Sequence, residues 1–219
     1  RVIDDAGGQA TFMAPVTVRN VPPSNVQMIP AASVVDEGTL LNFSFSFDDP
    51  GTLDTHTFTV DWGDGKAVAG AIVGRTFAAS HTYADDGVYT VRVRVTDDDT
   101  GVGEQTIQIT VNNVPPTLTV VADQTINEGS LLSLPTIGTF TDPGFDNPLN
   151  TLDPANGGEV EETFTFEINW GDGTAPDIGF ATITTPGGPG VLTAGSFPGM
   201  HTDADNGVYA VTVTVMDDD

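Results

Sequence analysis

The sequence predicts an all-β protein made of β-sandwiches in tandem, with about seven strands in each. Three observations lead to this prediction. Apolar and polar residues alternate over short segments, clusters of Gly, Pro, Asn and Asp separate these segments, and the whole pattern recurs along the chain. Alternation is typical of strands that bury one face, and closely spaced strands joined by turns are typical of a β-sandwich.

The charge of the chain is strongly negative. Its 219 residues include 31 Asp and Glu against 6 Lys and Arg, and the 125 residues after Arg94 carry 20 acids and no Lys or Arg. Such a polyanion does not bind nucleic acid backbones or anionic membranes, and no apolar run is long enough for membrane insertion. Its counter-ions are either Ca²⁺ at defined sites or a diffuse atmosphere around an acidic surface. The chain has no Cys, so its stability comes from its core or from metal.

One motif sets the internal register. Val60–Gly65 reads Val-Asp-Trp-Gly-Asp-Gly, and Ile168–Gly173 reads Ile-Asn-Trp-Gly-Asp-Gly. An alternating apolar segment leads into each copy, which indicates a half-buried strand, and Asp-Gly indicates a tight turn after it. The Trp is therefore expected on the third strand of each unit, filling the core.

Other recurring segments mark the boundaries between the repeat units of the chain. The sequence Asn112-Asn113-Val114-Pro115-Pro116 ends one unit, and Arg19-Asn20-Val21-Pro22-Pro23 matches it near the start of the chain. We therefore interpret residues 1–23 as the C-terminal strand, Phe12–Asn20, and the linker of a preceding unit. Residues 24–116 form a complete unit. Residues 117–219 form a unit with two loop insertions that lacks its last strand.

The strands of the complete unit follow in order from their alternation. The first contains Val26 and Met28, the second runs from Leu41 to Phe47, and the third leads to Trp62. A less regular stretch follows through Phe77, and two long strands are then centred on Val93 and Ile109. Asp85-x-Gly87-x-Tyr89 places a Tyr at the entry of a late strand, as in the tyrosine corner of immunoglobulin-like sandwiches, so we expect that topology.

Together these motifs resemble the PKD (polycystic kidney disease) repeat of large bacterial surface proteins. They are Glu37-Gly38, Trp62–Gly65, His81–Tyr89, Val95–Asp99 and Asn112–Pro116, and the resemblance covers essentially the whole chain. The second unit departs from it at Asn169, at Asp203 and in its insertions. The resemblance implies an extracellular sandwich used as a spacer, an adhesion element or an accessory module, without catalysis.

The topology predicts where the acidic turns lie. Because strands alternate in direction, the turns of a unit gather at two poles, and each junction between units becomes a carboxylate cluster suited to Ca²⁺. The entry pole of the complete unit holds Asn25, Asp48, Asp49, Asp97, Asp98 and Asp99. Its exit pole holds Glu37, Asp64, Asp85, Asp86, Asn112 and Asn113, which face Asp142, Asp217, Asp218 and Asp219 of the next unit. The family resemblance adds that some members bind Ca²⁺ at the entry pole, where the matching residues are Asn25, Asp48 and Asp49, and Thr117 and Asp142.

The expected function is that of a non-catalytic, structural or adhesive repeat segment of a large extracellular or cell-surface protein, rigidified by calcium at the junctions. Its expected partners are neighbouring repeats of the same protein, other surface proteins or polysaccharide. The paired carboxylates recur in every unit, whereas an active site is a single constellation, so we expect no enzyme activity.

Two alternatives stay open at this point. A polysaccharide- or protein-binding accessory module of a secreted enzyme needs exposed aromatic residues, for which Tyr83, Phe145 and Phe180 are the candidates. A filament subunit would donate the strand Phe12–Asn20 to the incomplete unit of another molecule.

Overall fold

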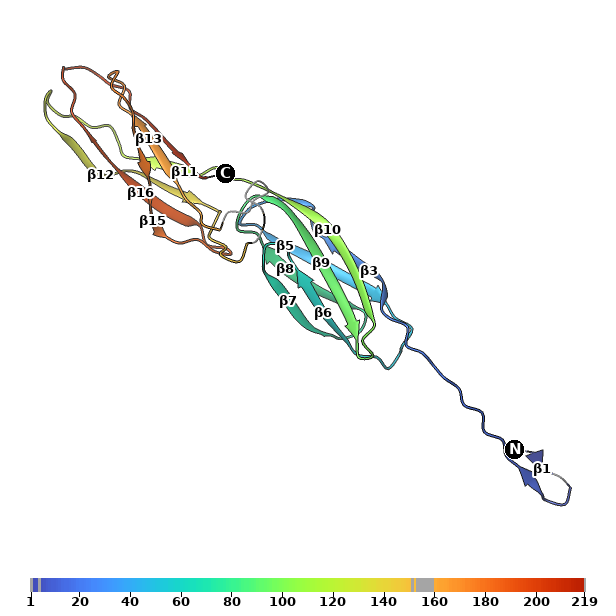
Figure 1. Cartoon of the computed structure of the whole chain (residues 1–219). Coiled ribbons are helices and arrows are strands. Elements are labelled where there is room, and N and C mark those ends of the chain that lie inside the picture. The colour runs from blue at the N-terminus through green and yellow to red at the C-terminus, as the bar shows by residue number, and fades with distance from the viewer. Residues whose placement is uncertain (1, 4, 151, 153–159, 219) are drawn as a thin grey trace.

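The protein folds into two β-sandwiches that lie end to end, and an extended N-terminal segment runs out from the first (Figure 1). This computed structural model describes residues 2–3, 5–150, 152 and 160–218. Every regular element within these ranges is a β-strand, as predicted. The described residues include no helix that could cross a membrane.

The first sandwich has two sheets, in the order β3-β5-β8 and β4-β10-β9-β6-β7. Antiparallel pairing joins all neighbouring strands except β4 and β10, which run parallel. The strands are β3 (Ser24–Pro30), β4 (Val34–Asp36), β5 (Leu40–Asp48), β6 (His56–Asp61), β7 (Ala67–Ile72), β8 (Thr76–Thr82), β9 (Gly87–Asp97) and β10 (Val102–Asn112).

The second sandwich repeats this plan, with sheets β11-β12-β16-β15 and β14-β13-β17. Among the described residues, β4 and β10 have no counterpart in it, so β17 pairs only with β13. The strands are β11 (Thr117–Val120), β12 (Leu132–Asp142), β13 (Thr165–Asn169), β14 (Asp177–Phe180), β15 (Thr182–Thr185), β16 (Thr193–His201) and β17 (Thr212–Met216).

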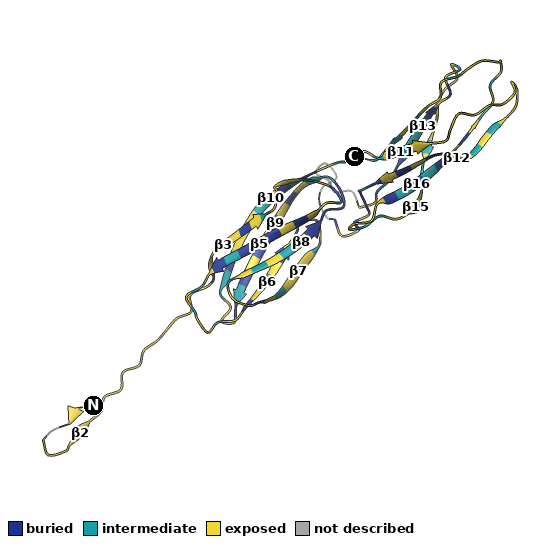
Figure 2. Cartoon of the chain, turned by 180° about the vertical axis from the view of Figure 1, so that it is seen from behind, coloured by how far each residue is buried: buried dark blue, intermediate teal, exposed yellow. Residues whose placement is uncertain are grey.

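Each core is built around its Trp. Trp62 and Trp170 are 2% and 3% exposed, and each stacks on a His, at ring-centroid distances of 4.9 Å to His81 and 4.7 Å to His201. Both Trp residues directly follow the third long strand instead of lying on it. In the first sandwich, the backbone N–H of Trp62 already donates to Lys66 O and closes the turn. Figure 2 shows how buried and exposed residues are distributed along the strands of the two sandwiches.

Tyr89 forms the predicted corner, because its hydroxyl donates to the carbonyl oxygens of Asp85 and Asp86. Two of the aromatic residues that we considered for ligand binding are not exposed. Tyr83 is 1% exposed and donates its hydroxyl to Trp62 O, and Phe145 is 4% exposed. That expectation was therefore wrong for both, since each side chain fills an interior position.

The N-terminal residues differ from the prediction of a strand over Phe12–Asn20. Val2–Ile3 (β1) and Gln9–Ala10 (β2) form a small hairpin, whereas residues 11–23 belong to no strand. The physical reason is the lack of a neighbour, because a strand exists only when a second strand bonds to it. Val16 and Val18 are consequently 85% and 88% exposed.

The first insertion of the second sandwich docks onto the first sandwich. Asn147 is 2% exposed and donates to the backbone oxygen of Asp64 at 3.0 Å, and Phe145 N donates to Ala84 O. Leu152 packs against the core of the first sandwich. We interpreted this segment as a loop insertion, and the structure adds that the insertion ties the two sandwiches together.

Gly65 makes this docking possible. It has a φ of +85°, and a Cβ at this position would collide with the carbonyl oxygen of Leu149. Its counterpart Gly173 has a φ of +88°, but no atom lies within 4 Å of the equivalent Cβ position.

We predict that Gly65→Ala destabilises the chain more than Gly173→Ala does. Both changes force Ala into a left-handed conformation, at a cost of about 1–2 kcal/mol. Only Gly65→Ala also displaces the insertion. Urea unfolding measures the difference, and hydrogen exchange at Asn147 and Leu149 reports the displacement. Equal stability losses together with unchanged exchange would show that the docking does not depend on Gly65.

Candidate metal centre

Acids of both sandwiches lie close together at the junction between them. Glu37 follows β4 in a turn and is 3% exposed. Its backbone N–H donates to Asn112 O, and its Oε1 accepts a 2.8 Å hydrogen bond from Val114 N in the linker. The carboxylate therefore points along the linker toward the second sandwich.

Asp142 faces it from the second sandwich. It ends β12, is 1% exposed, and accepts a 2.7 Å hydrogen bond at Oδ1 from Gly144 N. The turn that carries it lies against the first sandwich, since a Cβ on Gly38 would lie 2.8 Å from Pro143. Asp217 follows β17 and accepts a hydrogen bond from the Asn113 side chain.

Several buried oxygens at this junction have no hydrogen-bond partner within the described part of the chain. They are Glu37 Oε2, Asn113 Oδ1, Asp142 Oδ2 and Asp217 Oδ2. None of these three carboxylates forms a salt bridge with any described Lys, Arg or His. Buried polar atoms normally find a partner, so this concentration of acceptors indicates a place for a cation.

The electrostatics of the junction agree with this interpretation. Burial raises the pKa of Glu37 to about 8, with a contribution from the negative charges of Asp142, Asp85 and Asp217. Burial and the Asp217 charge raise the pKa of Asp142 to about 6. Without a cation, the junction thus favours protonated carboxyl groups.

The other residues predicted for the junction have different environments. Asp64 is 1% exposed, and its oxygens accept hydrogen bonds from Lys66 N, His81 Nε2 and Asn147 Nδ2. It therefore lies at the junction, but its acceptors are occupied. Asp85 is 4% exposed and lies close enough to act on Glu37. The remaining residues predicted for the junction are less central. The side chain of Asn112 donates to Asp36, and Asp218 accepts a hydrogen bond from Thr163 N. Asp86 is the third of these residues, and Asp219 lies outside the described residues.

At the entry pole of the first sandwich, hydrogen-bond donors of the protein itself bond to the acidic side chains and to the turn that carries them. Asp49 is the counterpart of Asp142, and its carboxylate accepts hydrogen bonds from Gly51 N and His56 Nε2. Arg75 donates to the carbonyl oxygens of Asp49 and Gly51. The other predicted acids of this pole also accept hydrogen bonds: Asp48 from Asn25, Asp97 from Gly101 and Asn20, and Asp98 from Thr55. Asp99 is exposed, and so is Thr117 at the entry pole of the second sandwich.

Two groups of possible ligands elsewhere have atoms that all lie within 4.8 Å of one another. They are Asp49, Asp54 and Asp97, and Asp172, His201 and Asp203. In both groups protein donors already bond to some of the carboxylates, namely Asp49 and Asp97 in the first and Asp172 in the second. Hydrogen bonds from Thr174 lower the pKa of Asp172 to about 2, and His201 bonds to its second oxygen. The junction acids that the structure describes are not among these compact groups.

Two residues that lie beside the predicted acids, His56 and Glu162, could not be identified from the sequence. His56 reads as a loop residue in the sequence, but it is 3% exposed and bonds to Asp49. Glu162 lies in the first insertion, and its carboxylate and that of Asp142 both flank Gly144. An Asp or Glu inside a loop insertion has no counterpart in the first unit, so the repeat register gives no signal for it.

The donor set at the junction determines the kind of ion that fits. Within the described part of the chain, the ligand atoms available at the junction are carboxylate and amide oxygens, without sulfur or imidazole. Hard cations such as Ca²⁺ take six to eight oxygens, with water completing the shell, whereas Zn²⁺ sites are usually built from His and Cys.

Comparison with known proteins gives the family of the first sandwich. Residues 20–111 match the family model of the PKD domain. The first sandwich is a PKD domain. No curated protein sequence matched the chain.

Several solved structures resemble the chain. The PKD domain of an M14-like peptidase from a Thermoplasmatales archaeon is 28% identical, with 42% of this chain and 98% of that chain covered and a TM-score of 0.38. The PKD domain of the human VPS10 domain-containing receptor SorCS2 is 25% identical, with 50% and 87% covered and a TM-score of 0.35. The Yersinia pseudotuberculosis adhesin InvE is 19% identical, with 88% and 51% covered and a TM-score of 0.33.

We predict that the metal-free chain loses stability as the pH rises from about 5 to about 8. The folded state holds protons on Glu37 and Asp142 up to about pH 8 and about pH 6, whereas in the unfolded state these groups ionise near their ordinary values of 4.5 and 3.8. The folded state thus binds more protons within this window, so stability falls with pH and levels off above it.

Thermal unfolding in EDTA between pH 5 and 9 measures this effect. In Glu37→Gln the decline should end near pH 6, because only the Asp142 contribution is left. Glu128→Gln, at the exposed equivalent position, should keep the full profile. Stability that rises between pH 6 and 8 in the unmodified chain would contradict the prediction.

Proposed function

We propose that this chain is a non-catalytic structural segment of an extracellular or cell-surface protein, in which Ca²⁺ at the junction fixes the orientation of the two sandwiches. The PKD domain is a non-catalytic module, which supports the first part of the proposal. The second part depends on a single observation. Ligand oxygens of both sandwiches are buried at the junction without a hydrogen-bond partner among residues 2–3, 5–150, 152 and 160–218.

A divalent cation accounts for this arrangement better than water does. Glu37, Asp142 and Asp217 would carry three negative charges in a space largely closed to solvent, and repulsion between them opposes the association of the sandwiches. A bound Ca²⁺ offsets two of these charges. It also supplies a partner for each free oxygen, which neutral water provides only in part.

The proposed ion links elements that otherwise meet through a short linker. Glu37 and Asn113 belong to the first sandwich, and Asp142 and Asp217 belong to the second. Pro115 and Pro116 already restrict the linker, and the bond from Asn147 to Asp64 provides a second fixed point. The ion would act as a third point, and three points define a relative orientation.

The alternative of a polysaccharide-binding module has less support. Of the three aromatic residues considered for it, Phe180 is 78% exposed, whereas Tyr83 and Phe145 are buried. Stacking on sugar rings requires several exposed aromatic faces on one surface.

We predict that Ca²⁺ binds the chain and that Asp142→Asn weakens this binding by about tenfold or more. Removing one charged ligand from a site of this size costs more than 1.4 kcal/mol, which is a factor of ten. Isothermal titration at pH 8 gives the affinity. At about 100 times the dissociation constant, Ca²⁺ should stabilise the folded chain by about 2.7 kcal/mol.

Asp49→Asn is the matched control, because Asp49 occupies the same turn position and is paired with His56. It should leave the main affinity unchanged. Small-angle scattering should also show a narrower distribution of orientations with Ca²⁺ than with EDTA. No binding heat and no rise in melting temperature with Ca²⁺ would reject the calcium proposal.

A further inference from the structure

The second sandwich brings a His and two Asp side chains together away from the junction. His201 is the last residue of β16, Asp203 follows two residues later, and Asp172 lies in the Trp-Gly-Asp-Gly turn after β13. His201 Nε2 lies 3.1 Å from Asp172 Oδ2 and 3.6 Å from Asp203 Oδ1. One ligand atom of each residue lies within 4.8 Å of the other two. We call these three residues the His-Asp-Asp cluster.

The first sandwich has the same His–Asp pair without the second carboxylate. His81 Nε2 lies 2.8 Å from Asp64 Oδ2. Tyr83 occupies the position that corresponds to Asp203, and its hydroxyl donates to Trp62 O. The exchange of Tyr for Asp therefore places a second carboxylate beside the imidazole in one sandwich and not in the other.

The place of Asp203 is set by elements that both sandwiches contain. In the first sandwich, the side chain of Tyr83 contacts Trp62, His81 and Tyr89, all of which precede β10 in the chain. The second sandwich has a Trp, a His and a Tyr at the corresponding positions. The cluster is therefore a property of the Trp turn and of the end of β16.

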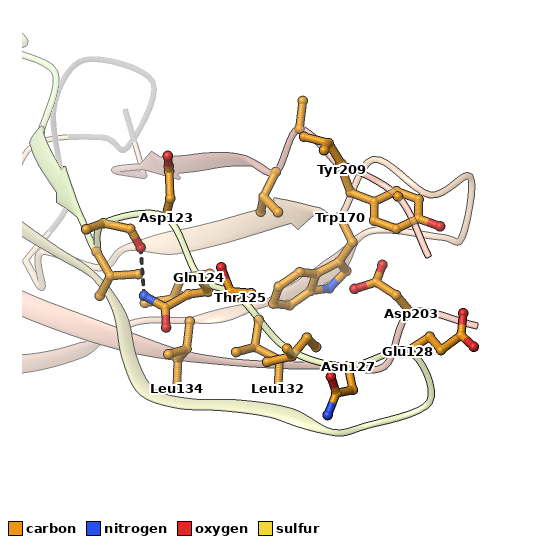
Figure 3. Close-up of a pocket in the computed structure, with 18 of the residues that line it drawn as sticks. Asp123, Gln124, Thr125, Asn127, Glu128, Leu132, Leu134, Trp170, Asp203 and Tyr209 are labelled. Atoms are coloured by element: carbon orange, nitrogen blue, oxygen red, sulfur yellow. Dashed lines mark hydrogen bonds between the residues drawn. The ribbon is translucent and has the colours of Figure 1, made fainter. Parts of the chain in front are cut away.

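One oxygen of Asp203 has no hydrogen-bond partner within the described part of the chain. This oxygen, Oδ1, is buried, and His201 Nε2 at 3.6 Å is too distant for a hydrogen bond. The Asp203 side chain points toward the indole of Trp170, on which His201 stacks (Figure 3). A proton on Nε2 cannot serve both carboxylates, because one N–H points in one direction and Asp172 is the closer acceptor.

A metal ion bonded to His201 Nε2 can serve both carboxylates at once. In a tetrahedral Zn²⁺ site the ligand atoms lie about 2.0–2.2 Å from the ion, so two of them are about 3.4 Å apart. The distances of 3.1 Å and 3.6 Å from Nε2 to the two carboxylates lie on either side of this value. The cluster thus has the ligand spacing of a site for one ion.

Neighbouring residues hold the ligands in place. The backbone N–H and the hydroxyl of Thr174 both donate to Asp172 Oδ1, at 3.0 Å and 2.6 Å, which leaves Oδ2 directed at His201. The Trp170 ring stacks on the imidazole at 4.7 Å with an interplanar angle of 9°. Contacts of this kind orient the ligands of metal sites. The three side chains are between 13% and 19% exposed, so an ion and water can reach them.

We propose that the His-Asp-Asp cluster binds a transition-metal ion of the Zn²⁺ class, with water at the open coordination position. One imidazole nitrogen and two carboxylate oxygens suit Zn²⁺, Co²⁺ or Ni²⁺, whereas Ca²⁺ takes oxygen ligands. The ion would link the turn after β13 to β16, which belong to the two different sheets of the second sandwich.

This site is separate from the junction. Leu132 pairs with His201 at one end of β12, whereas Asp142 pairs with Thr193 at the other end. Binding of a transition metal therefore does not depend on the proposed calcium function.

Isothermal titration with Zn²⁺ at neutral pH tests the proposal, in a buffer with an excess of Ca²⁺ that occupies sites made of oxygen alone. Asp203→Asn should weaken Zn²⁺ binding by at least about tenfold, because it removes one charged ligand. Asp203→Tyr should do the same, and Tyr83 shows that the fold accepts a Tyr at this position. Unchanged circular dichroism checks that both variants are folded.

Asp205→Asn is the matched control, because it removes the same charge two residues further along, outside the cluster. Its affinity for Zn²⁺ should stay within about threefold of that of the unmodified chain, since an exposed charge contributes little. NMR of the imidazole nitrogens should show a shift of His201 Nε2 with Zn²⁺ and none of His81, which has one carboxylate beside it. Equal affinities of the Asp203 and Asp205 variants, an unshifted His201, or no binding heat in the unmodified chain would overturn the proposal.

Discussion

A carboxylate that leaves water must be protonated, hydrogen-bonded or paired with a cation, and the junction of this protein depends on that constraint. Glu37 and Asp142 are nearly inaccessible, and each has one oxygen bonded to a backbone N–H and one that is not. Burying the second oxygen without a partner costs free energy, which opposes close packing of the two sandwiches when both carboxylates are ionised. The orientation of one sandwich on the other is thus coupled to the ionic state of a few side chains.

The buried turn carboxylates at the two entry poles, Asp49 and Asp142, differ in their bonding partners. In the first sandwich, His56 bonds to the Asp49 carboxylate and Arg75 bonds to the turn around it. In the second, Phe164 occupies the position of His56, and there is no Lys or Arg in the chain after Arg94. Among the described residues, the carboxylate of this Asp-Pro-Gly turn is thus paired with a His at one pole and with no Lys, Arg or His at the other.

Much of this architecture could be predicted from the sequence, because strand alternation and turn chemistry are local. The repeat register and strand direction also predict that Glu37, Asp142 and Asp217 share one junction. The docking of Asn147 on Asp64, the burial of Phe145 and the partner of His56 could not be predicted in this way. Each depends on contacts between segments far apart in sequence, and the insertion that carries Asn147 has no counterpart in the other unit.

The distribution of cations has a further consequence for the molecule as a whole. All 6 Lys and Arg residues lie among residues 1–94, where they face 11 acids, while the rest of the chain has 20 acids. Because the two sandwiches lie end to end, the protein is an electric dipole along its long axis: residues 1–116, which include the first sandwich, carry 15 acids against 6 Lys and Arg and a net charge of −9, whereas residues 117–219 carry 16 acids, no Lys or Arg and a net charge of −16. Two molecules that approach with their acidic ends together repel each other most strongly, so the charge pattern gives the rod a direction at distances within the Debye length, about 8 Å at physiological salt.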